Sequence, residues 1–146
     1  MITEFELIEL KRNVYELLIL SEEVDLIKAK IMEGYNDSGS FDAEFLKRYN
    51  LLKCSEEYIE SKKALESFIW NLAEEDLYNL HIAFSIGRLG PDSKDFNNEY
   101  LIQLEKAKKL CKDKYYIEDK FIEIKYNCLK KYLIKGINYL YDSKKI

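Results

Sequence analysis

The scarcity of glycine and proline is the feature that most constrains how this chain can fold. Only 5 Gly and 1 Pro occur in 146 residues. These two residue types mark most tight turns, so a fold of many short strands would lack the turns that it needs. No stretch alternates between apolar and polar residues as a half-buried strand does. The composition therefore favours a few long helices.

The first segment, residues 3–33, has the periodicity of an amphipathic helix. Thr3, followed three residues later by Glu6, matches a capping box and predicts where this helix begins. We expect one apolar stripe along the helix, widened on one side by a second set of residues. The stripe consists of Leu7, Leu10, Val14, Leu17, Val24 and Ile31, and the widening set of Phe5, Ile8, Tyr15 and Leu18.

Further helical segments follow, separated by polar loops. Residues 34–40 are rich in Gly, Asn, Asp and Ser and predict a loop. Helices are expected over 42–70, 74–88, 98–112 and 115–141. The run from Gly87 to Pro91 predicts the end of the third helix. Around Asp113 the sequence leaves open a turn or one continuous helix.

These segments together predict an all-α fold. We expect one domain over residues 1–146, with loops near 34–41 and 89–97. Its architecture would be an antiparallel bundle of four to five helices, with long first, second and last helices. A chain of this length buries enough surface to need no metal or disulfide for stability.

Charge is unevenly distributed along the chain, although the net charge is only −4. Residues 1–80 hold 9 Lys and Arg against 18 Asp and Glu, whereas residues 81–146 hold 14 against 9. Such a division either helps the two halves pack or creates opposed surface patches for a partner. The sequence alone leaves both readings open.

The cysteines and the chain start bear on cellular location. Cys54, Cys111 and Cys128 are widely spaced within helical segments, which is typical of a reducing compartment. The acidic start lacks the positive charge of a secretory signal, and no 18-residue run is free of charges. We expect a cytoplasmic protein of bacterial or phage origin, with no membrane contact.

Catalytic and metal-binding patterns are missing from the sequence. His81 is the only histidine and lacks the Glu-x-x-His pairing of di-iron bundles, and there is no Cys-x-x-Cys pair. Ser85 lies in an incomplete nucleophile elbow, and the segment after Gly87 lacks phosphate-loop spacing. We therefore predict a non-enzymatic protein with no metal and no cofactor, and a half-buried, hydrogen-bonded His81.

Two stretches carry a resemblance to a known family. The run Leu72-x-x-Glu75-x-Leu77-x-x-Leu80-x-x-Ala83 closes with Ile86-Gly87-Arg88, and Leu129-x-x-Tyr132-Leu133-x-x-Gly136-Ile137 follows later. Over about residues 69–141 the chain resembles a bacterial all-helical family classed as a domain of unknown function. The resemblance implies an all-α fold and does not specify an activity. It also draws attention to Arg88, which either complements the helix dipole beside a Gly87 cap or contacts a partner or an anion.

The aromatic content suggests a binding role. The chain has 12 Tyr, 7 Phe and Trp70, which suits either a tyrosine-rich core or an exposed binding surface. Our leading hypothesis is a protein-binding module of the inhibitor, immunity or regulatory-adaptor kind, acting through an acidic, Tyr-rich helical surface. The candidate partner-binding residues are Glu22, Glu23, Glu56, Glu57 and Arg88.

Two alternatives remain open at this point. One is a nucleic-acid-associated protein that uses the lysine-rich C-terminal half, where tyrosines are interleaved with the lysines. The other is a self-associating structural protein, a homodimer whose long first and last helices pair across a two-fold axis.

Overall fold

The computed structural model describes residues 2–32 and 43–142, and this part of the chain is helical with no strand, so the all-α prediction is confirmed. The predicted loop near residues 34–41 lies outside the described residues. In chain order the elements are α1 (Glu4–Ile31), α2 (Ala43–Cys54), α3 (Glu56–Trp70), α4 (Glu74–Leu89), α5 (Phe96–Leu110), α6 (Lys114–Ile117), the π-helical segment η1 (Glu118–Ile122) and α7 (Tyr126–Asp142).

The predicted count of four to five helices is wrong, since two of the expected helices are divided. The expected helix over 42–70 breaks at Ser55, whose hydroxyl accepts a hydrogen bond from the Tyr58 amide and caps α3. Asp113 likewise accepts from the Tyr115 amide at 2.9 Å and begins α6. The segment around Asp113 is therefore a turn, and the expected helix over 115–141 becomes α6, η1 and α7.

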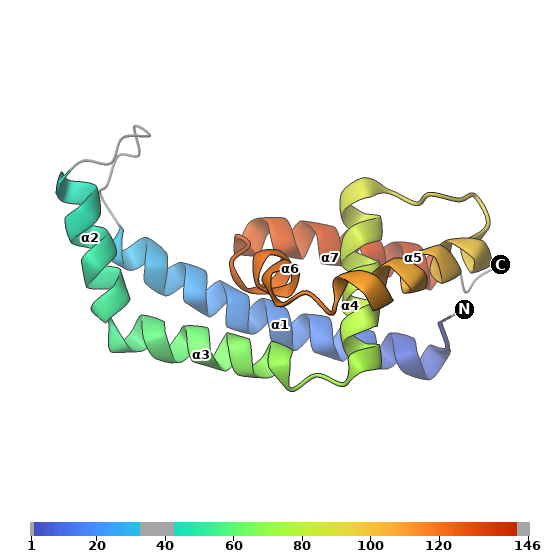
Figure 1. The fold of residues 1–146 in the computed structure, drawn as a ribbon, viewed down its shortest axis with the longest axis horizontal. Coiled ribbons are helices and arrows are strands. Elements are labelled where there is room, and N and C mark those ends of the chain that lie inside the picture. The colour runs from blue at the N-terminus through green and yellow to red at the C-terminus, as the bar shows by residue number, and fades with distance from the viewer. Residues whose placement is uncertain (1, 33–42, 143–146) are drawn as a thin grey trace.

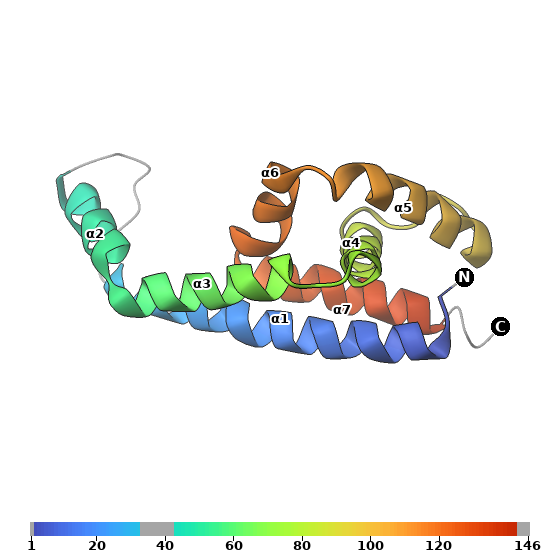
Figure 2. The same ribbon diagram turned by 60° about the horizontal axis from the view of Figure 1, so that its bottom comes forward.

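The helices do not form the expected antiparallel bundle. In Figures 1 and 2, α1 and α3 run antiparallel side by side, while α4 stands across them. α7 lies along α1 and contacts α4 more extensively than any other pair of elements. α2 projects at the far end of the α1–α3 pair (Figure 1) and buries only Leu52. The molecule therefore consists of an elongated arm and a denser part built around α4.

α4 and α7 approach each other closely through two glycines. A Cβ atom on Gly87 would lie 1.8 Å from the carbonyl oxygen of Tyr132. A Cβ atom on Gly136 would lie 1.7 Å from the carbonyl oxygen of Ala83. Each helix thus presents a glycine to the backbone of the other, one turn from the residue that receives its partner's glycine. No larger residue fits at either position without moving a backbone.

This contact corrects the interpretation of Gly87 as a helix cap. Gly87 is buried inside α4, which continues to Leu89. The residue that ends the helix is Gly90, with a φ of 80° and an amide that donates to the carbonyl of Ile86 at 2.9 Å. The helix therefore ends within the predicted segment, at Gly90, whereas Gly87 packs against α7.

Within the part of the chain that the structure describes, one apolar core connects α1, α3, α4, α5, α6, η1 and α7. Phe84 lies at its centre, with ring centroids 5.6 Å from Phe121 and 5.5 Å from Tyr132, both in edge-to-face geometry. The long first helix contributes one face, formed by Leu7, Leu10, Val14, Leu17 and Val24. Thr3 caps this helix as predicted, accepting from the Glu6 amide at 3.1 Å.

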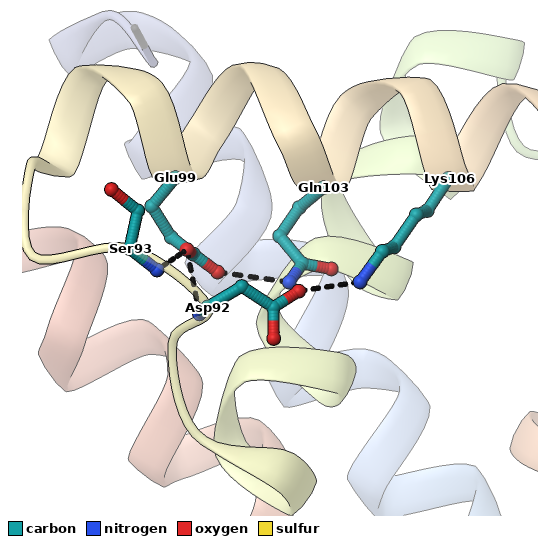
Figure 3. A network of polar contacts seen from close by, with 5 residues as sticks. All are labelled: Asp92, Ser93, Glu99, Gln103 and Lys106. Atoms are coloured by element: carbon teal, nitrogen blue, oxygen red, sulfur yellow. Dashed lines mark hydrogen bonds and ion pairs between the residues drawn. The ribbon is translucent and has the colours of Figure 1, made fainter.

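A buried carboxylate holds the loop between α4 and α5 (Figure 3). Glu99 is fully buried, and its Oε2 accepts from the backbone amides of Asp92 and Ser93, both at 2.7 Å. Its Oε1 accepts from the side-chain amide of Gln103 at 2.9 Å. Lys106 forms an ion pair with Asp92 at the edge of the same network. Backbone donors satisfy the buried charge, so the loop is fixed against α5.

We predict that Gly136→Ala destabilises the protein by about 3 kcal/mol, because the methyl group collides with the Ala83 carbonyl and overpacking costs of this order follow. The sign of the change in unfolding free energy distinguishes the two cases, because glycine to alanine in an unconstrained helix stabilises by up to about 1 kcal/mol. Urea denaturation followed by circular dichroism measures the effect. Asn138→Ala on the exposed side of α7 is the control, with an expected change within about 0.5 kcal/mol. An unchanged midpoint for Gly136→Ala would contradict the close crossing.

Candidate interaction surface

The outer face of α1 carries a row of exposed apolar side chains. Phe5, Ile8, Tyr15, Ile19 and Leu26 are each between 49% and 71% exposed. Together with Arg12 and Glu22 they recur at alternating spacings of three and four residues, and these seven residues are called the outer face of α1 below. This is the a/d spacing of a coiled-coil seam.

This surface corrects one expectation from the sequence. Phe5, Ile8 and Tyr15 were expected to widen the buried stripe, yet they lie on the opposite side of the helix and are exposed. Only Leu18 packs against the core as expected. At 100° per residue, Ile8 and Leu17 are nearly opposite one another, so α1 carries two apolar stripes and only one of them is covered. Ile19 and Leu26 complete the second stripe and were missed.

Charged residues border the outer face of α1 on both sides. Glu16 and Glu23 are exposed along one edge, and half-buried Glu9, which bonds Arg12, continues that edge. The other edge is tied to α7. Its Asp25 accepts from the Tyr126 amide at 2.7 Å, and the Lys11 ammonium lies 4.4 Å from the centre of the Tyr141 ring. One border is therefore acidic and open, and the other is engaged within the molecule.

The five residues predicted as a partner site do not come together. Glu22 belongs to the outer face of α1, and Glu23 lies at its acidic edge. Glu56 and Glu57 are exposed in the first turn of α3, which lies at the same end of the molecule as the C-terminal half of α1 (Figure 1). Arg88 is exposed in the last turn of α4, away from α3.

Arg88 lines two small cavities beside α6 and η1. One has a volume of about 280 Å³ and is also lined by His81, Lys106 and Tyr116. The other, of about 260 Å³, is lined by Asp119 and Lys120 among others, and Lys120 lines both. Arg88 therefore belongs to a different surface from the predicted acidic residues.

His81 is fully buried, at 1% exposure, rather than half-buried as the sequence predicted. Its Nδ1 is hydrogen-bonded to the Tyr116 hydroxyl at 2.8 Å, so the prediction of a hydrogen-bonded histidine is confirmed. Among the described residues no partner reaches its Nε2. Burial, with a smaller contribution from the charge of Lys106, lowers the pKa of His81 to about 4. At neutral pH the imidazole is therefore an uncharged packing group between α4 and α6.

The cysteines and acidic residues do not assemble a metal site in the part of the chain that the structure describes. Cys54 and Cys128 are exposed, and burial raises the pKa of the half-buried Cys111 thiol to about 12. A polar cavity of about 580 Å³ between α1, α4 and α5 contains Glu6, Glu74 and Tyr78. The Tyr78 hydroxyl donates to Glu74 at 2.6 Å, which raises the pKa of Tyr78 to about 12.

Within residues 2–32 and 43–142, no helix combines the length and apolar character needed to cross a membrane. No protein-family model matches the chain, and neither curated proteins nor solved structures include a match. The resemblance to a family of unknown function therefore stays a prediction.

We predict that acid destabilises the wild-type protein more than His81→Phe. The unfolded chain takes up a proton near pH 6.5, whereas folded His81 does so only near pH 4. The stability due to neutral His81 is therefore fully present above pH 6.5 and is lost as pH falls to 4, by about 3 kcal/mol. The nearby Lys106 ammonium also opposes protonation of the ring.

Urea denaturation of both proteins at pH 7.5, 5.5 and 4.5 tests this prediction. The difference in unfolding free energy between wild type and variant isolates His81, because the carboxylates titrate in both proteins. Asn138→Ala, which keeps both the histidine and its hydrogen bond to Tyr116, serves as the control and should retain the wild-type pH dependence. Parallel curves for wild type and His81→Phe would contradict the lowered pKa.

Proposed function

We propose that this chain is a non-enzymatic protein-binding module of the inhibitor, immunity or regulatory-adaptor kind, and that the outer face of α1 is its docking surface. One observation carries the proposal: a 28-residue helix exposes a second apolar stripe, at coiled-coil spacing, opposite the stripe that packs into the core.

The length and continuity of the outer face support this reading. From Phe5 to Leu26 the stripe extends about 30 Å at 1.5 Å per residue. Single exposed apolar residues are ordinary on protein surfaces, but a contiguous apolar surface usually marks an interaction site. The spacing suits a helix as the occupant, since knobs from a second helix fit between residues placed three and four apart.

The rest of the fold holds α1 in place as a formed helix. The opposite side of α1 packs on α3, α4 and α7, and the Asp25–Tyr126 hydrogen bond ties the helix to the start of α7. A helix that is already formed and fixed loses little conformational entropy on binding. Figure 2 shows α1 along an outer border of the molecule.

The nucleic-acid alternative has less support among the described residues. Lys106, Lys108 and Lys114 each form an ion pair with a carboxylate. Lys130 lies 5.8 Å from the centre of the Tyr126 ring. The carboxylates beside the first three lysines lower the local positive potential, and binding to a phosphate backbone depends on neutralisation by several cations. We therefore favour a protein partner.

Replacing the apolar residues of the outer face tests the proposed function. We expect the double variant Ile8→Ser, Ile19→Ser to recover partner proteins at least about tenfold less than wild type in affinity purification from the host, because the outer face loses two of its five large apolar side chains. Quantitative mass spectrometry measures recovery, and untagged copies of this chain are counted among the partners. Both positions are exposed, so stability should change by no more than about 1 kcal/mol.

A matched control variant replaces exposed apolar residues elsewhere. Leu101→Ser, Ile134→Ser changes side chains of similar exposure on α5 and α7 and should recover the wild-type set of proteins. Equal recovery by the outer-face variant and the control would overturn the proposed docking surface.

A further inference from the structure

We propose that the occupant of the outer face of α1 is a second copy of this chain, bound antiparallel across a two-fold axis at the level of Leu17. The inference rests on the proposed docking surface and names its occupant. It follows from the order of residues along the outer face, which is complementary to itself when reversed.

The complementarity appears when the two copies are aligned on Leu17. In an antiparallel seam each a-position residue packs against a d-position residue of the partner. With the two-fold axis at Leu17, a residue of one copy faces the residue of the second copy that lies the same number of positions from Leu17 on its other side. The resulting layers are Ile8 with Leu26, Arg12 with Glu22, and Tyr15 with Ile19, each formed twice. Phe5 faces Ala29, an exposed residue one step beyond the outer face.

The two charged positions of the seam decide the register. Arg12 and Glu22 interrupt an otherwise apolar seam, and each lies five residues from Leu17. In the proposed register the two charges meet, so both interruptions become ion pairs within the interface. A shift by one heptad in either direction places Glu22 against an apolar side chain, which leaves a carboxylate desolvated without a partner.

The same charges exclude a parallel arrangement. In a parallel seam like positions face each other, so Arg12 would meet Arg12 and Glu22 would meet Glu22 of the second copy. Like charges held together in an interface are strongly unfavourable. A two-fold interface also requires that residue i contacts j and j contacts i, and the antiparallel pairing meets this requirement.

The acidic edge of the outer face weakly opposes this pairing, and it gives a second way to test the orientation of the two copies. In the antiparallel dimer Glu16 lies near Glu16 of the second copy, and Glu9 near its Glu23. These carboxylates lie at the rim, where exposed like charges destabilise only modestly and are screened by salt. The edge therefore lowers the affinity without changing the register.

Charge exchange at the two interrupting positions is the test. Sedimentation velocity of the purified full chain over a concentration series measures the dimer dissociation constant. Arg12→Glu and Glu22→Arg should each weaken dimerisation at least about tenfold, because each puts like charges together at two places. The double variant Arg12→Glu, Glu22→Arg should restore the constant to within about threefold of wild type. Lys131→Glu, an exposed charge reversal on α7, should leave it unchanged.

Glu16→Gln reports the orientation independently. In the antiparallel dimer it removes a like-charge contact near the axis, so dimerisation should tighten by about threefold. In a parallel dimer Glu16 would face Lys11 of the second copy, and the same change would loosen the dimer. Circular dichroism confirms that each variant folds.

A chain that stays monomeric at high concentration would overturn the inference, as would a double variant that does not recover dimerisation or a looser Glu16→Gln dimer. These outcomes leave the docking surface itself intact if Ile8→Ser, Ile19→Ser still loses its partners from the host. Equal recovery by that variant and its control would overturn the docking surface, and the inference with it.

Discussion

The close crossing of α4 and α7 is the contact on which the arrangement of the other helices depends. Gly87 and Gly136 bring the two backbones together at a distance that no other residue allows. α4 consequently stands inside the molecule with eight buried residues, and α7 is drawn in beside it. α1 then covers one side of this pair with a single face. A helix so placed needs only one apolar stripe, and the second stripe of α1 is therefore surplus to folding.

The extent to which sequence predicted this structure differs from element to element. α1 and α4 were predicted nearly to their ends, because Thr3 and the Gly90–Pro91 stop act locally. The break at Ser55 was missed because one capping serine within a helical pattern is a weak signal. The π-helical segment carries no sequence mark at all, since its packing of Phe121 and Ile122 depends on distant residues.

The candidate surface could be predicted only in part from the sequence. Two apolar stripes on one helix have the same periodicity, so spacing identifies both without saying which one the protein covers. Glu22 was named from its charge, and its neighbours Ile19 and Leu26 emerge only once the core is known. His81 and Tyr116 are 35 residues apart, and nothing local links them. Contacts of this kind are products of the tertiary fold, as is the separation of Arg88 from the acidic residues.

The buried Glu99 carboxylate has a consequence for the order of folding. Its partners Asp92, Ser93 and Gln103 lie within seven residues, so the loop and α5 close over a short stretch of chain. The glycine contact between α4 and α7 joins positions more than forty residues apart and must await a long loop closure. The α4–α5 hairpin therefore requires a shorter loop closure than the contact between α4 and α7. The packing of α7 on α4, and on α1 through Asp25 and Tyr126, therefore costs more loop-closure entropy than the loop that Glu99 orders.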